Sequence, residues 1–125
     1  HGIPKKYFDK GDPYHCYCHK TTRLISEKYS SIKIKTTFQS RFGPQEWLQP
    51  YTDKTLENLP KEGVKNVLTI CPGFASDCVE TLEEIQIQAK ESFLNSGGEN
   101  FDMVPCLNDN SDHIILLKSL IERNI

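Results

Sequence analysis

The sequence predicts an α/β fold, an open parallel sheet flanked by helices on both faces. Short β-type runs alternate with longer amphipathic segments, and Gly and Pro residues separate them. The run Asn66–Cys71 is nearly continuously apolar, which is typical of strands buried on both faces of a parallel sheet. Strands that alternate with helices imply crossover connections, and 125 residues suffice for one domain with one core.

The first third of the chain predicts one helix and one strand. The helix runs from Asp12, an N-cap residue before Pro13 at the first helical position, to Tyr29. Its buried stripe is expected to contain Cys18, Thr22, Ile25 and Tyr29. The strand covers Ile32–Phe38, where β-branched residues alternate with lysines.

The rest of the chain continues the alternation of helices and strands. The predicted elements are a helix over Thr52–Glu62, a strand over Asn66–Cys71, a helix over Asp77–Ser96, a strand over Phe101–Val104 and a helix from near Ser111. Gly63 and Gly97 follow two of these helices, as C-terminal glycines do. A strand that ends just before His1 would complete the parallel sheet.

The carboxyl ends of the strands define the expected binding edge, because ligands of open α/β sheets bind there. The segments at that edge are His1–Pro4, Gln39–Pro44, Pro72–Asp77 and Cys106–Asp109. They hold the most unusual residues of the chain, so we expect them to line one cleft.

Acidic residues follow one face of the predicted helix Asp77–Ser96. Glu80 and Glu84 are four residues apart, with Gln88 one turn further on. This stripe suits a divalent cation or the removal of protons, although Asp77 and Glu80 also fit a capping box, which spacing alone favours. The imidazole of His1 can accept a proton or bind Fe²⁺, but a single His decides little by itself.

Three residues near the first strand suggest an anionic or flat ligand. Ser40 and Arg41 could hold a carboxylate or phosphate, and Trp47 could stack on a planar group. Taken singly, a solvated Arg and an ordinary buried Trp are the more common interpretation.

The cysteines leave metal binding open. The stretch from His15 to His19 looks like a metal cluster, but within a helix Cys16 and Cys18 point in different directions. Three further cysteines border the predicted cleft: Cys71, Cys78 and Cys106. They could bind a soft metal, or they could be small core residues. Because five is an odd number, we expect reduced thiols in a cytosolic-type compartment.

Charge and hydropathy exclude two classes of protein. The formal net charge of −2 offers no basic face for nucleic acid. The apolar runs are far shorter than the roughly 20 residues that cross a bilayer, and the first residues do not resemble a targeting peptide. We expect a soluble or peripherally membrane-attached chain.

Several blocks together resemble the C-terminal half of the ferrochelatase family, closest to its proteobacterial branch. They occur in the family's order and spacing: His1-Gly2-Ile3-Pro4, Lys10-Gly11-Asp12-Pro13-Tyr14, Phe38-Gln39-Ser40-Arg41-Phe42-Gly43-Pro44, Trp47-Leu48, Pro50, Thr52-Asp53, Cys71-Pro72-Gly73-Phe74, Asp77, Glu80-Thr81-Leu82-Glu83-Glu84 and Leu107-Asn108. The resemblance covers essentially the whole chain.

This resemblance implies that residues 1–125 form one of two similar domains, chelatase-like and of the three-layer Rossmann type, with the N-terminal half absent. It implies the last step of haem biosynthesis, insertion of Fe²⁺ into protoporphyrin IX held between the domains, and an inactive fragment. It makes His1 and Glu80 catalytic, lets His1, Glu80 and Glu84 handle the metal, and places Ser40, Arg41 and Trp47 at the porphyrin. It implies no permanent cofactor and, without a cysteine-rich extension, no iron–sulfur cluster.

Two alternatives to this enzyme remain. One is a single-domain cobalt or sirohydrochlorin chelatase that works as a homodimer, and the other is a non-catalytic haem or metal carrier with the same fold. The missing strand before His1 and the block Gln39-Ser40-Arg41-Phe42-Gly43-Pro44 argue against the single-domain chelatase, and the presence of both His1 and Glu80 favours an enzyme over a carrier. The expected location is the cytoplasm, with a peripheral contact on the inner face of the membrane and a homodimer left open.

Overall fold

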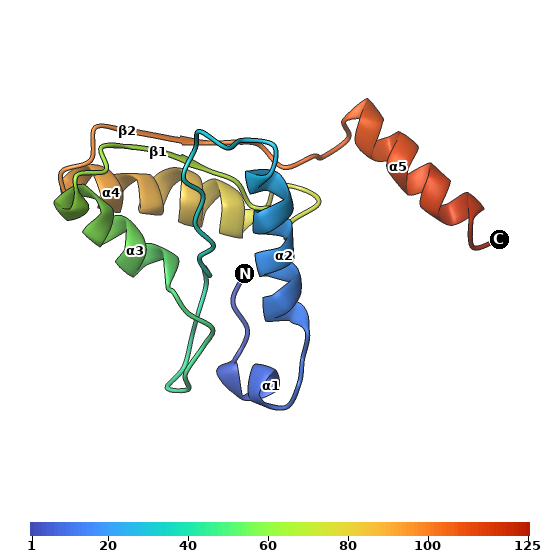
Figure 1. Cartoon of the computed structure of the whole chain (residues 1–125), viewed down its shortest axis with the longest axis horizontal. Helices are drawn as coiled ribbons and strands as arrows, with labels where there is room; N and C mark the ends of the chain where they lie inside the picture. Colours follow the sequence, from blue (N-terminus) through green and yellow to red (C-terminus); the bar gives the residue numbers. More distant parts are fainter.

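From Thr52 onward helices and strands alternate, as the sequence predicts, whereas the residues before it form two helices and no strand (Figure 1). The computed structural model describes all 125 residues. Its elements are α1 (Lys5–Asp9), α2 (Tyr14–Ser26), α3 (Thr52–Asn58), the 3₁₀-helix η1 (Leu59–Glu62), β1 (Asn66–Thr69), the π-helix η2 (Glu80–Ala89), α4 (Lys90–Asn95), β2 (Asn100–Met103) and α5 (Ser111–Glu122). The α/β class and the parallel sheet are confirmed.

The sheet consists of β1 and β2, which pair in parallel with Asn66 opposite Asn100 and Thr69 opposite Met103. The continuous helix η2–α4 connects the two strands and crosses one face of the sheet (Figure 1). This is the strand–helix–strand crossover that the alternation of segments predicted.

The core lies between this face of the sheet and helices α3, η2 and α4. Its buried members come from four elements: Leu56, Ile85, Ala89, Phe93 and Phe101. The Phe93 side chain is 0% exposed, and its ring centroid lies 6.0 Å from that of Phe101. Along β2, Phe101 is buried and Asp102 is exposed, because successive side chains of a strand point to opposite faces.

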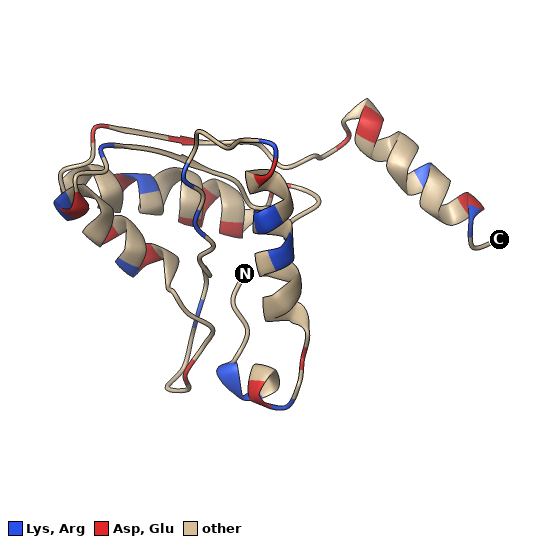
Figure 2. Cartoon of the chain, viewed as in Figure 1, with Lys and Arg blue, Asp and Glu red and all other residues tan.

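The opposite face of the sheet is open to solvent. Helices therefore cover one face of the sheet, whereas the sequence predicted helices on both faces. Leu68 on β1 is 65% exposed. Helix α5 extends away from the sheet (Figure 1), and its few charged residues lie among long uncharged stretches (Figure 2). Its aliphatic side chains are exposed as a group: Ile114, Ile115, Leu116, Leu117, Leu120 and Ile121.

The predicted strand Ile32–Phe38 is wrong for the chain as it stands. Only Phe38 forms a bridge, to Tyr51, and no backbone N–H of residues 33–37 donates a hydrogen bond. A strand needs a neighbour for its ladder, and none lies beside this segment. Helix α2 ends at Ser26, so Tyr29 is exposed and not buried as predicted, and helix α1 after Pro4 was not predicted.

We expect the substitution Gly98→Ala to destabilise the chain by about 1–3 kcal/mol. An added Cβ would lie 2.2 Å from Cε1 of Phe93, a side chain that is buried on all sides. Gly73→Ala is the matched control, because its Cβ would lie 3.6 Å from the Tyr14 hydroxyl, an ordinary contact. Urea unfolding of both variants tests this, and equal free energies of unfolding would contradict it.

Candidate functional site

A cavity of about 680 Å³ opens between helix η2 and the loop Gln39–Phe42. His1 and the start of α3, at Thr52 and Asp53, border it from the loop side. Glu80, Glu84 and Gln88 border it from the helix side. The structure therefore brings together five of the six site residues that the sequence predicted: His1, Ser40, Arg41, Glu80 and Glu84.

The helix wall of this cavity is a π-helix, a form that is rare and concentrated at functional sites. The capping box predicted for Asp77 and Glu80 does not form. The Asp77 N–H donates instead to Asn108 Oδ1 at 2.8 Å, and the Asp77 carboxylate accepts from the hydroxyl of buried Thr81 at 2.9 Å. Thr81 and Asn108 therefore anchor the start of the helix, and the Glu80 side chain is left for the cavity.

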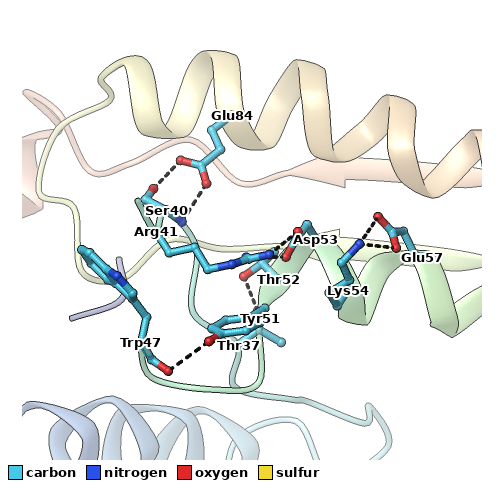
Figure 3. A network of polar contacts seen from close by, with 10 residues as sticks. All are labelled: Thr37, Ser40, Arg41, Trp47, Tyr51, Thr52, Asp53, Lys54, Glu57 and Glu84. Carbon is cyan, nitrogen blue, oxygen red and sulfur yellow. Dashed lines mark hydrogen bonds and ion pairs between the residues drawn. The ribbon is translucent and has the colours of Figure 1, made fainter. Parts of the chain in front are cut away.

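Glu84 binds the facing loop directly (Figure 3). Its Oε1 accepts from the Ser40 backbone N–H at 2.8 Å, and its Oε2 accepts from the Ser40 hydroxyl and from Gln39 Nε2 at 3.3 Å. Gln39 Nε2 also donates to the Glu80 carbonyl at 2.7 Å. These bonds join the loop to the helix across 41 to 45 residues of sequence.

Glu80 is an ionised carboxylate at neutral pH. A hydrogen bond with the Cys78 side chain lowers the pKa of Glu80 below its usual value, and backbone hydrogen bonding lowers it further. Unlike Glu84, it forms no side-chain hydrogen bond to the loop Gln39–Phe42. The charge can therefore face a cation or accept a proton in the cavity.

His1 is held at the edge of the cavity by its backbone. Tyr14 donates to the His1 carbonyl at 2.7 Å, and the Gly2 N–H donates to the Gln39 carbonyl at 2.7 Å. The imidazole Nδ1 lies 2.6 Å from the Gly2 carbonyl. A hydrogen bond at this distance requires a proton on Nδ1, which leaves Nε2 as the acceptor in the neutral ring.

Arg41 is fixed by Asp53 in a bidentate ion pair, with both N···O distances 2.8 Å (Figure 3). Its guanidinium also lies over the Tyr51 ring, 4.0 Å from the centroid. The remaining N–H groups of Arg41 are free to donate to an anion in the cavity. Asp53 belongs to a motif block of the sequence, but only its pairing with Arg41 reveals what it does.

Trp47 does not line the cavity, in contrast to the expected stacking role. It is 5% exposed, and its Nε1 donates to the Phe42 carbonyl at 3.1 Å. Phe42, which is 72% exposed and borders the cavity, packs on Trp47 with 5.0 Å between ring centroids. Phe42 is therefore a residue that sequence reasoning missed, because adjacent aromatic residues do not reveal which one is buried.

Two segments expected in the cleft, Pro72–Asp77 and Cys106–Asp109, do not border the cavity. They bind each other, since the Cys106 N–H and the Asn108 amide both donate to the Asp77 carboxylate, at 3.2 and 2.8 Å. The Asp77 carboxylate accepts both hydrogen bonds and therefore holds the two loops together next to the site.

No three His, Cys, Asp or Glu side chains converge as a metal-binding group. All five cysteines are unpaired, with Cys16 exposed on α2 and Cys18 half-buried. Burial raises the pKa of Cys71, and burial together with Asp77 raises that of Cys106 to about 11. Both thiols are therefore poor nucleophiles at neutral pH.

We expect the substitution Asp53→Asn to make the free energy of unfolding depend less on pH in the acid range. Arg41 lowers the pKa of Asp53, so the pair stabilises the fold above the unfolded pKa of about 3.9 and is lost as pH falls through the folded value. Because the pair is partly exposed, the effect should be at most about 1 kcal/mol. Urea unfolding from pH 7 to 2.5 measures it. Parent and variant should converge at the acid end, and a constant gap would contradict the assignment.

The fold and the site define a parallel α/β domain with an open cavity lined by an imidazole, three carboxylates, three hydroxyls and a guanidinium. A sequence model described as Ferrochelatase matches residues 1–125. The chain belongs to the ferrochelatase family, as its sequence blocks predicted.

Curated relatives agree with this assignment over the whole chain. The ferrochelatases of Rhizobium meliloti, Pseudoalteromonas atlantica and Francisella tularensis subsp. novicida are 58%, 55% and 51% identical to it. Each alignment covers 100% of this chain but only 38%, 35% and 38% of the relative. The chain thus spans little more than a third of the length of these relatives. None of its helices is long and apolar enough to cross a membrane.

Proposed function

We propose that the longer protein to which this chain belongs inserts Fe²⁺ into protoporphyrin IX, the step that forms protohaem. One observation carries this proposal: His1, Ser40, Arg41 and Glu80, which come from three separate stretches of the sequence, border one open cavity in a chain of the ferrochelatase family. Such a cavity offers both proton acceptors and groups that bind carboxylates.

Metal insertion removes two protons from the pyrrole nitrogens as the Fe²⁺ ion loses its water. In this proposal the His1 imidazole and the Glu80 carboxylate take up these protons, as positioned bases of suitable pKa can. The ionised Glu80 also attracts the cation. Fe²⁺ is a substrate here, and it is bound only while the porphyrin is being metallated.

The porphyrin propionates are the proposed partners of Ser40 and Arg41. Arg41 is oriented by Asp53 and keeps N–H groups for a carboxylate. The exposed ring of Phe42, backed by Trp47, offers a flat apolar surface. The metal-binding role expected for Glu84 is left out of this proposal, since both of its oxygens accept hydrogen bonds from the loop.

We also propose that this chain is one of two similar domains and that the rest of the protein supplies the other wall of the cavity. The free N–H groups of residues 33–37 support a further parallel strand beside them, provided by residues that precede His1. The exposed aliphatic side chains of α5 support a large apolar contact with the same missing part.

The expected setting is the cytoplasm, with no permanent cofactor and no iron–sulfur cluster. The five unpaired thiols support a reducing compartment. A peripheral contact with the inner face of the membrane and a homodimer stay predictions of the resemblance.

Anaerobic insertion of Fe²⁺, or of Zn²⁺ as a stable substitute, into a soluble porphyrin tests the function. The full-length protein should change the visible absorbance of the porphyrin with multiple turnovers. A stoichiometric haem complex without turnover would favour the carrier. Activity of the 125-residue chain alone as a dimer would favour the single-domain chelatase.

A further inference from the structure

We infer that Glu84 is a positioning residue, which holds the loop Gln39–Ser40 as the porphyrin-facing wall of the cavity and does not bind the metal. This inference rests on the proposed function. It concerns how the cavity is shaped before either substrate enters.

The hydrogen bonds of Glu84 account for most of its carboxylate. Oε1 accepts from the Ser40 backbone N–H at 2.8 Å. Oε2 accepts from the Ser40 hydroxyl and, at 3.3 Å, from Gln39 Nε2. A carboxylate offers about four lone-pair positions, so three of them already serve the loop. Only one position is left for any other partner, so the loop and not a metal ion uses most of this carboxylate.

The backbone of Ser40 shows why the loop needs this support. Its φ of 60° lies in the left-handed region, which is uncommon for any residue other than Gly. Such a conformation persists only when its surroundings hold it in place. Glu84 does so from both sides of the residue, through the amide N–H and through the side-chain hydroxyl.

The loop that Glu84 holds is the one that carries the proposed porphyrin contacts. Gln39 is buried and bonds to both the Glu80 carbonyl and Glu84. Arg41 and Phe42 follow Ser40 directly and border the cavity. If the Ser40 bonds are lost, the backbone that carries these two side chains loses its support at Ser40, whereas Glu80 keeps its place on the helix. Loss of Glu84 should therefore weaken porphyrin binding more than metal binding.

The test compares Glu84→Ala and Glu84→Gln in the full-length protein, with Zn²⁺ and a soluble porphyrin. The Ala variant should raise the KM for porphyrin about tenfold or more and leave the KM for Zn²⁺ within about twofold. The Gln variant should stay within about threefold of the parent, since its amide oxygen can accept from the Ser40 N–H, its NH₂ can donate to the hydroxyl, and only the long bond from Gln39 at 3.3 Å is lost. Glu83→Gln, an exposed position on the same helix, is the matched control.

A Gln variant as impaired as the Ala variant, with a raised KM for Zn²⁺, would overturn the inference, because an amide replaces a hydrogen-bond acceptor but not a charged metal ligand. Hydrogen exchange of the Ser40 amide separates this inference from the proposed function. The amide should lose protection in Glu84→Ala and keep it in Glu84→Gln whether or not the parent inserts metal. Unchanged protection in both variants also overturns the inference.

Discussion

Replacing Glu80 with Gln in the full-length protein should lower kcat for metal insertion by about 10²–10⁴-fold, the usual contribution of a positioned proton acceptor. Glu80 borders the cavity with an ionised carboxylate that is not committed to the facing loop. Gln has nearly the same size but can neither accept a proton nor attract Fe²⁺. The measurement is Zn²⁺ or Fe²⁺ insertion at saturating porphyrin.

The control for this experiment is Glu83→Gln, which removes a neighbouring charge outside the cavity and should keep kcat within about twofold. Both variants should have the parent's circular dichroism spectrum and melting temperature. A Glu80→Gln protein with full activity would remove Glu80 from the mechanism and leave His1 as the principal base.

Phe93→Ala should lower the free energy of unfolding by about 3–5 kcal/mol. Phe93 is the most buried large side chain, and it packs from helix α4 against Phe101 of strand β2. Its removal leaves a cavity at the junction of the elements that hold the site helix on the sheet. Urea unfolding of the full-length protein measures the change, provided that the transition of this domain is resolved.

Leu94→Ala provides the comparison, because Leu94 follows Phe93 on the same helix but has an exposed side chain. This substitution should lower the free energy of unfolding by less than about 1 kcal/mol. Equal effects of the two substitutions would mean that the core does not depend on Phe93. The unfolding slope should stay unchanged in both variants.

Local signals in the sequence predicted most elements to within a few residues. Helix and strand periodicity placed α3, β1, β2 and α5, and the long helix after Asp77 is continuous from Val79 to Asn95. These predictions succeed because periodicity and end signals act within a few turns of chain. The strand Ile32–Phe38 failed for the opposite reason, since its pairing depends on a partner strand that local sequence does not supply.

The site divides in the same way. Motif blocks and residue types are local properties, so the α/β class, the family and the identity of the reactive groups could be predicted from them. The folded arrangement decides which of these groups meet. It turned Trp47 inward and Phe42 outward, paired Arg41 with Asp53, and committed Glu84 to Ser40 across 44 residues. Those contacts depend on burial and on the relative placement of loop and helix, which no neighbouring residue encodes.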